Sequence, residues 1–324
     1  MADSMTTAVA PEPAYSGARP GSSGTRSDRV TRVLRALLRW AGVLPFTAYV
    51  AAGLLAPLVA IAIYSLQPNH GGFVASRATA PTLSNFDTAL HGTYLTGLTN
   101  VVLLALVTSI VPGVFGFLLA YAIHTARRGI VLRRVVITAA GVFANFGGVP
   151  LAFLFIATLS TTGVVTGWIK DLFNFDIWDH GFSLYNPYGV ALVYLYFQIP
   201  LMVLVILPAL EGLRPAWREA AENLGGRSWH YWRHVAGPVL LPSFLGCVLL
   251  LFGSGLSAYA TAEALTGGTI ALTPIQIGAL LNGNVLAGQE NLGYALGVIL
   301  VVIIAVVMIG YVLLQRRAAR WLRS

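Results

Sequence analysis

The residues best suited to a chemical role lie together in residues 211–242, EGLRPAWREAAENLGGRSWHYWRHVAGPVLLP. Glu219 offers a charged contact, and the small side chains of Ala220–Ala221 beside it would let another backbone approach closely. Gly225 suits the end of a helix, where a left-handed conformation is needed, and Pro238 opens an apolar run. The pattern predicts two short helices with a glycine corner, which is a surface for docking another molecule. The alternative is an ordinary loop at a membrane surface.

Residues for metal or nucleotide chemistry are scarce. His230 and His234 stand four apart, so one helical face could present both to a metal, but the sequence places no third ligand and contains no HExxH. Two histidines within the docking loop are the favoured interpretation. The chain has no GxxxxGK[ST] phosphate-binding motif, and its single cysteine, Cys247, excludes an intrachain disulfide and a cysteine-based metal cluster. We therefore expect this chain to bind no cofactor itself.

Polar residues within apolar runs form a second candidate group, because such residues often mark a transport pathway. Those inside or at the ends of such runs are Asn145, Tyr196, Gln198, Tyr259 and Glu263. The same side chains could instead join helices by hydrogen bonds, and Glu263 could be a solvated helix end. Both interpretations stay open from the sequence alone.

The apolar runs themselves decide the fold class. Of the 324 residues, 56% are hydrophobic and only 10% charged, whereas an average soluble domain has about 25% charged residues. Crossing a hydrocarbon core of about 30 Å takes about 20 residues of helix. The runs that are long enough are 43–66, 95–123, 135–159, 187–210, 238–262 and 292–314. They predict an all-α membrane protein with six transmembrane helices and exclude a soluble enzyme.

Basic residues alternate between the loops. Of the 20 Lys and Arg, 18 fall in the N-terminal segment, in the loops after the second and fourth runs, and in the C-terminal tail. Only Arg77 and Lys170 fall in other loops. Because basic loops face the cytoplasm, both termini are expected there, in a prokaryotic inner membrane. The net charge of +8 then orients the bundle and is not the footprint of a nucleic-acid-binding protein.

The N-terminal region is expected to lie outside the bundle. Residues 1–28 are rich in Ala, Pro, Ser, Gly and Thr, which predicts a disordered cytoplasmic tail. In residues 29–40 the arginines and the apolar residues fall on opposite helical faces, which predicts a basic helix on the anionic inner leaflet. A plain topology signal is the alternative. Residues 41–320 then form the six-span domain, and 321–324 the cytoplasmic C-terminus.

The docking loop carries a specific resemblance. Its pattern consists of six residues at fixed spacing: Glu219, Ala220, Ala221, Gly225, Val235 and Pro238. This pattern resembles the EAA loop of the permease subunits of binding-protein-dependent ABC importers of the type I fold. Gly237 stands where the family has Leu, and Trp232 where it usually has Phe. The resemblance covers roughly residues 43–320 and is nearest to the polyamine, phosphonate, iron and sulfate branch.

The resemblance implies a mechanism and a set of partners. Residues 211–238 would be a coupling loop, in which Glu219 contacts a separate cytoplasmic ATPase, Ala220–Ala221 packs against it and Gly225 permits the turn. ATP and Mg would be bound on two copies of that ATPase, so the chain itself would be no enzyme. A second permease, related and separately encoded, would complete the pathway. An extracytoplasmic solute-binding protein would deliver the substrate.

The expected substrate is a small polar solute, with polyamine as the first choice by general similarity and phosphonate, iron, sulfate or sugar as alternatives. Two other function classes stay open. A secondary carrier would work without an ATPase, although the lack of charge within the runs argues against a proton-driven one. A membrane-embedded enzyme would need a polar catalytic cluster that the runs lack. Co-purification with an ATPase and ATP-dependent uptake would separate these classes.

Overall fold

Helices make up the computed structural model of the chain, which describes residues 44–69, 80–125, 130–282 and 288–321. The chain divides into two units at Leu58. The first unit contains α2 (Leu44–Val50), the π-helical segment η1 (Ala51–Leu55) and the start of α3 (Ala56–Ser65). The predicted tail 1–28, the predicted basic helix 29–40 and residues 322–324 lie outside the described residues.

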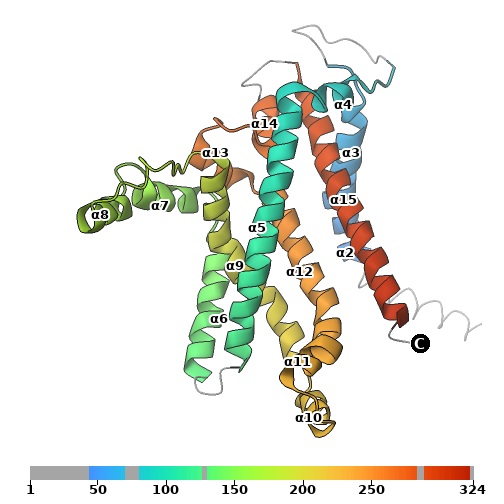
Figure 1. The fold of residues 1–324 in the computed structure, drawn as a ribbon. Helices are drawn as coiled ribbons and strands as arrows, with labels where there is room; N and C mark the ends of the chain where they lie inside the picture. The colour runs from blue at the N-terminus through green and yellow to red at the C-terminus, as the bar shows by residue number, and fades with distance from the viewer. Residues whose placement is uncertain (1–43, 70–79, 126–129, 283–287, 322–324) are drawn as a thin grey trace, which may run out of the picture. The chain divides into compact units, whose positions relative to one another are not determined.

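The second unit contains the remaining helices (Figure 1). In chain order they are α4 (Ser84–Ala89), α5 (Gly92–Thr125), α6 (Ile130–Asn145), α7 (Val149–Leu159), α8 (Val164–Phe173), α9 (Pro187–Glu211), α10 (Pro215–Asn223), α11 (Ser228–Tyr231), π-helical η2 (Trp232–Ala236), α12 (Gly237–Ser257), α13 (Tyr259–Thr266), α14 (Thr273–Leu281) and α15 (Glu290–Trp321).

Six helical stretches among the described residues are long and apolar enough to cross a membrane. They are Pro45–Ser65, Gly92–Thr125, Val149–Phe173, Pro187–Glu211, Ser228–Ser257 and Glu290–Arg316. The predicted all-α fold with six transmembrane candidates is therefore confirmed. The side of the membrane on which each terminus lies stays a prediction.

Both π-helical segments end two residues before a proline. The segment η1 precedes Pro57, and η2 precedes Pro238. In each, the residue before the proline donates its backbone N–H five residues back, from Ala56 to Ala51 and from Gly237 to Trp232. A proline lacks an N–H and clashes with the carbonyl four residues earlier, and a π-bulge widens the helix at that point. The helix therefore continues through each proline.

The core of the second unit forms where α5 packs against α9 and α12, which run side by side with it in Figure 1. Glycines permit the close approach. A Cβ on Gly116 of α5 would lie 2.5 Å from Met202 Cβ and 2.9 Å from the carbonyl oxygen of Ile199, both on α9. A Cβ on Gly113 would lie 2.9 Å from Val248 of α12. Gly116 thus permits the close approach of α9, and Gly113 permits that of α12.

The predicted span 135–159 is wrong as a single helix. The structure breaks it after Asn145, at the end of α6, and resumes at Val149. Gly148 has φ 75° and ψ −151°, a combination open in practice only to glycine, and Pro150 then suits the first turn of α7. Figure 1 shows α7 and α8 lying across the direction of α9, whereas α6 runs along it. With 16 residues, α6 is about 24 Å long.

The predicted span 238–262 also differs at both ends. Its helix begins at Ser228, continues through η2 and ends at Ser257. Ala258 has a non-helical conformation (φ −75°, ψ 84°), and α13 follows in a new direction. The sequence analysis placed the start at Pro238, because proline is common in the first turn of a helix. The π-bulge before Pro238 accommodates the proline inside a helix, so the helix can begin ten residues earlier.

The polar segment before α5 is fixed to the end of the first span. This segment contains the short helix α4, which begins at Ser84. Its buried Asn85 donates through Nδ2 to the carbonyl oxygens of Ser65 at 3.0 Å and Gln67 at 2.7 Å, and accepts from Asn69 at 2.8 Å. Asn69 in turn accepts from the backbone N–H of Leu292 at 3.2 Å. One asparagine pair therefore joins α3, α4 and α15.

We expect Gly116→Ala to destabilise the protein by about 1–3 kcal/mol, because the new methyl group overpacks the contact between α5 and α9. Thermal unfolding of the purified protein in detergent measures the effect. Gly141→Ala is the matched control, since a Cβ on Gly141 of α6 meets nothing within 4 Å and alanine is the better helix former. Equal unfolding midpoints for the two variants would contradict the assignment of Gly116 to this contact.

Candidate functional site

The docking loop forms a helix with a complete C-terminal cap. Arg214 is extended, Pro215 occupies the first turn of α10, and the helix ends at Asn223. Gly226 donates its N–H to the carbonyl of Ala221 at 2.9 Å, and Gly225 donates to that of Glu222 at 2.9 Å. This pair of bonds is a Schellman motif, and Gly225 has the positive φ, 76°, that the motif requires. The predicted glycine corner is therefore present.

The helix α10 has an inner and an outer face. Trp217 and Ala221 are half-buried, whereas Glu219 and Ala220 are exposed. At about 100° per residue, Glu219 lies about 200° around the helix from Trp217. Its carboxylate is thus on the face turned away from the rest of the chain. In Figure 1, α10 lies beyond the ends of α5 and α9, at the end opposite α4 and α14.

The second half of the loop joins directly to a long helix. The prediction of a short helical segment at 228–235 is confirmed by α11 and η2, but Pro238 lies inside a continuous helix rather than at its start. The second half of the loop is therefore the first part of one helical stretch that extends from Ser228 to Ser257. Arg133 of α6 and Glu211 at the end of α9 form an ion pair at this end.

The two histidines of the loop are exposed and stack on each other. Their ring centroids lie 6.2 Å apart with 15° between the planes, and His234 Nδ1 lies 3.2 Å from the carbonyl oxygen of His230. Within the part of the chain that the structure describes, no group of three or more His, Cys, Asp or Glu could hold a metal ion.

Two of the proposed pathway residues lie at the break between α6 and α7. Asn145 is exposed and donates to the carbonyl of Gly141 at 2.8 Å. Tyr196 of α9 is half-buried, with its ring 5.5 Å from Phe143 and 5.7 Å from Phe155. The tyrosine therefore contacts the helix on each side of the break.

Side chains of other helices form hydrogen bonds with backbone groups at the two helix breaks, which lie before α7 and after α12. The backbone N–H of Gly148 donates to Thr261 Oγ1 of α13 at 2.9 Å. The hydroxyl of Tyr194 of α9 donates to the carbonyl of Ala258, which separates α12 from α13. At each break one backbone group is thus satisfied by a side chain from another helix, α13 for Gly148 and α9 for Ala258. No sequence pattern pointed to Thr261 or Tyr194, because their bonding partners lie 113 and 64 residues away along the chain.

Gln198 is fully buried, with 0% of its surface exposed. Neither its Oε1 nor its Nε2 has a hydrogen-bond partner among the described residues. A buried amide without partners costs roughly 1–3 kcal/mol. Gln198 lies one helical turn from Tyr194 and lines no open surface in this conformation.

The other two candidates, Tyr259 and Glu263, lie on α13. A Cβ on Gly278 of α14 would come within 2.9 Å of the ring of Tyr259, so the tyrosine joins these two helices closely. Glu263 is half-buried, and its Oε2 has no partner among the described residues. The carboxylate faces Gly268, where an added Cβ would be 3.9 Å from each of its oxygens.

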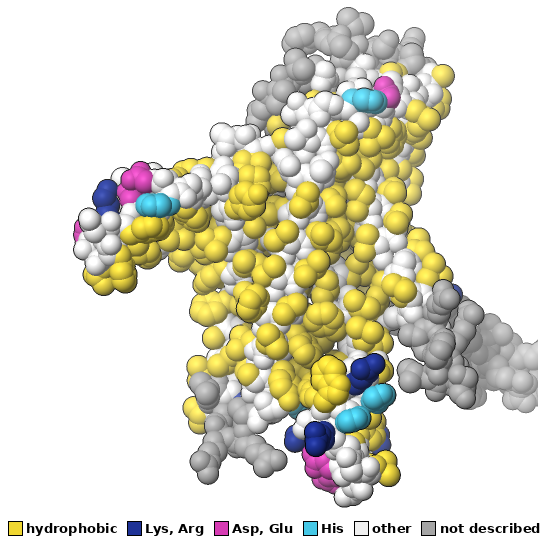
Figure 2. Space-filling model, in the orientation of Figure 1, with side chains coloured by type: hydrophobic (Ala, Val, Ile, Leu, Met, Phe, Trp, Pro, Cys, Tyr) yellow, Lys and Arg dark blue, Asp and Glu magenta, His cyan; other side chains and the backbone are white. Residues whose placement is uncertain are grey.

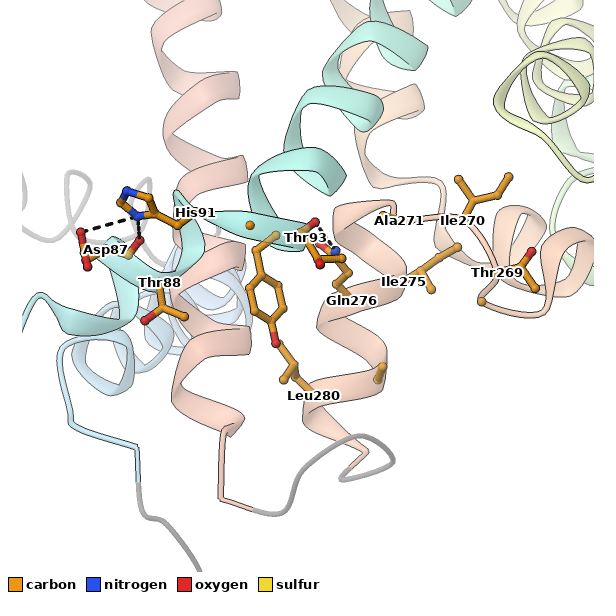
Figure 3. Close-up of a pocket in the computed structure, with 14 residues that line it drawn as sticks. Asp87, Thr88, His91, Thr93, Thr269, Ile270, Ala271, Ile275, Gln276 and Leu280 are labelled. Carbon is orange, nitrogen blue, oxygen red and sulfur yellow. Dashed lines mark hydrogen bonds and ion pairs between the residues drawn. The ribbon is translucent and has the colours of Figure 1, made fainter.

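A pocket of about 800 Å³ opens at the end opposite α10, between α4, the start of α5 and α14 (Figure 3). Gln276 donates to the carbonyl of Thr93 at 2.9 Å, and His91 Nδ1 lies 2.6 Å from the carbonyl oxygen of Asp87 and 3.7 Å from its Oδ1. Sequence reasoning missed this pocket. Its walls come from residues 87–94 and 268–280, and no local pattern links such distant segments.

Comparisons with known proteins agree with this architecture. The chain is 30% identical to the thiamine transport system permease protein ThiP of Salmonella typhimurium over 173 residues, which is 52% of this chain and 30% of ThiP. It is 31% identical to the sulfate transport system permease protein CysT of Escherichia coli over 165 residues, which is 50% of this chain and 56% of CysT. The matched regions are less than two thirds of either relative.

A crystal structure of a bacterial alginate ABC transporter in complex with alginate pentasaccharide-bound periplasmic protein has the same fold. The TM-score is 0.66 at 18% identity, covering 89% of this chain and 96% of that chain. Residues 113–320, which include α10 and both helix breaks, match the family described as "Binding-protein-dependent transport system inner membrane component". The chain therefore belongs to this family of membrane permeases, with the type I ABC importer fold.

Proposed function

We propose that the chain is the permease subunit of an ATP-driven importer, forms half of its translocation pathway, and couples to a cytoplasmic ATPase through α10. The observation that carries the proposal is the capped helix α10, whose outward face presents Glu219 and whose glycine corner leads to the helical stretch from Ser228 to Ser257. Movement of the docked helix would displace that helical stretch. The distribution of Arg residues supports a cytoplasmic position for this loop.

The partners follow from the same proposal. Two copies of an ABC ATPase bind ATP and Mg, since the sequence of this chain contains no GxxxxGK[ST] motif, and one of them docks at α10. A related, separately encoded second permease completes the pathway, and a solute-binding protein docks at the opposite end. The pocket between α4, α5 and α14 is the candidate contact for that protein. A periplasmic partner in the alginate transporter complex, which has the same fold, supports this kind of assembly.

The substrate is a small polar solute, and sulfate and thiamine are the first candidates because relatives with these names match the chain. Sulfate was among the sequence-based alternatives. Polyamine, the first choice from the sequence, has no support from these relatives. The solute would pass near the two helix breaks, because non-helical backbone at membrane depth occurs where it is buried or lines a water-filled path. Tyr196, Tyr259 and Glu263 are the proposed lining residues.

Uptake and co-purification together test the function. An affinity-tagged chain is isolated from native membranes and the retained proteins are identified, and vesicles are assayed for ATP-dependent uptake of labelled sulfate, thiamine and spermidine. We expect an ABC ATPase to co-purify and uptake of one solute to require ATP. Uptake that continues without any ATPase would make the protein a secondary carrier and overturn the proposal.

We expect Glu219→Lys to lower ATP-dependent uptake at least tenfold while the protein still inserts and unfolds at its normal temperature, because the change reverses charge on the exposed face of α10. Asp171→Lys, an equal charge change at an exposed position on α8, is the control and should transport normally. Retained ATPase co-purification and normal uptake in Glu219→Lys would contradict the coupling role.

Replacing Gly225 tests the helix cap. Gly225→Val forces a β-branched residue into positive φ, at a cost of roughly 1–2 kcal/mol, and should lower uptake strongly. Gly225→Asn should retain most activity, because asparagine tolerates this conformation. Uptake is measured for both in the same vesicles. Equal uptake would show that the left-handed corner is dispensable.

Gln198 should separate stability from transport. Gln198→Leu removes two buried polar atoms that have no partner among the described residues, so we expect a higher unfolding temperature. We also expect slower uptake, because the amide is proposed to gain a partner in another conformation of the transport cycle. Asn85→Leu is the contrast, because it removes the buried bonds to Ser65 and Gln67 and should lower the unfolding temperature. A stabilised Gln198→Leu variant with normal uptake would exclude a role for this amide in transport.

A further inference from the structure

A cavity of about 220 Å³ lies beside α10. The proposed coupling role of α10 does not involve this cavity. Its walls come from the end of α5, the start of α10 and the α11–η2 segment. The lining residues are Tyr121, His124, Thr125, Leu213, Arg214, Pro215, Arg218, Ser228, Tyr231 and Trp232. Two are arginines, one is a histidine and four carry hydroxyl groups, whereas none is acidic.

The positive charge of this cavity is only partly neutralised. Arg218 Nε donates to Glu222 Oε1 at 2.9 Å, which uses one of its five N–H donors. Both side chains of that pair are more than half exposed, so solvent screens their attraction. Among the described residues Arg214 forms no ion pair. Guanidinium groups beside hydroxyls are the donor set that suits a phosphate group.

An apolar groove of about 290 Å³ shares a wall with the cavity at Trp232. It lies between α5 and α12 and is lined by Val114, Phe117, Leu118, Trp232, Gly237, Leu240, Leu241 and Phe244. Trp232 lines both the cavity and the groove, and its ring meets Tyr121 edge-on at 5.1 Å. Tryptophan and tyrosine favour the boundary between hydrocarbon and head groups. The two aromatic rings therefore mark where polar lining gives way to apolar lining.

The dimensions match one leaflet of a bilayer. From His124 in the cavity to Val114 in the groove, α5 advances about 15 Å, which is half of the roughly 30 Å hydrocarbon core. Figure 2 shows charged and histidine side chains gathered around α10 and α11, next to the hydrophobic surface of the long helices. A ligand with a charged head and an apolar tail would fit both parts at once.

We propose that the cavity and the groove form a binding site for an anionic phospholipid. Arg214 and Arg218 bind the phosphate of the head group, and one acyl chain lies between α5 and α12 against Phe117 and Phe244. The lipid would join the start of α10 to the membrane. The site does not rest on the proposed transport function, because it requires only that the chain is inserted in a membrane.

Native mass spectrometry of the purified full chain tests this site. The probes are dioleoyl phosphatidylglycerol, dioleoyl phosphatidylcholine and inorganic phosphate. We expect phosphatidylglycerol to bind at least tenfold more tightly than phosphatidylcholine, and millimolar phosphate not to displace it. The double variant Arg214→Gln, Arg218→Gln should lose that preference by roughly tenfold or more, as expected for two arginines near an anionic head group.

The matched control is the double variant Arg134→Gln, Arg233→Gln. It removes the same charge from exposed arginines that do not line the cavity, and it should keep the preference. Thermal unfolding of each variant confirms that it is folded. The position of the acyl chain is measured by fluorescence quenching with acyl-brominated phosphatidylglycerol, which should be weaker in Trp232→Phe than in the unchanged protein.

Three results would overturn the proposal. Equal binding of the two phospholipids would show that no anionic site exists. An equal loss in the control double variant would show that only net charge matters. Complete displacement by inorganic phosphate would assign the cavity to a soluble anion. None of these outcomes depends on ATP-driven uptake, so the lipid site and the importer function can fail separately.

Discussion

Inside a lipid bilayer a backbone N–H or C=O has no water to bond, so each one must find a partner within the protein. The chain meets this constraint at each interruption of a long helix in a recognisable way. At Pro57 and Pro238, a preceding π-bulge lets the helix continue. At the break before α7, Thr261 accepts from the N–H of Gly148, and after α12 Tyr194 donates to the carbonyl of Ala258.

These π-bulges and side-chain hydrogen bonds lie where the long helices either continue or change direction. The bulge at η2 keeps residues 228–257 in one helical rod, which joins the exposed loop to the core of the second unit. By contrast, the breaks at Gly148 and Ala258 turn α7 and α13 away from their parent helices; Thr261 of α13 bonds the first break, and Tyr194 of α9 bonds the second.

Polar atoms without partners are rare in such a chain and are therefore informative. Gln198 is fully buried with no partner for its amide among the described residues, while Arg214 and Arg218 line a cavity beside α10. The cost of an unpaired amide or a concentrated charge favours a conformation or a ligand that supplies the missing partner. Gln198 therefore points to a second arrangement of α9, and the arginines point to an anionic head group.

The sequence by itself determined the six apolar stretches, the all-α class and the capped loop at Glu219–Gly225. Each of these features depends on residues that are close together in the sequence, from one helical turn up to the length of one membrane span. The sequence analysis misplaced the third span and the start of the fifth, since local patterns do not reveal that a glycine pair breaks an apolar run or that a π-bulge carries a helix through Pro238. Only the tertiary structure decided the partners of Gly148 and Tyr194, 113 and 64 residues away, the burial of Gln198, and the pockets. Those depend on contacts between distant segments, which packing alone selects.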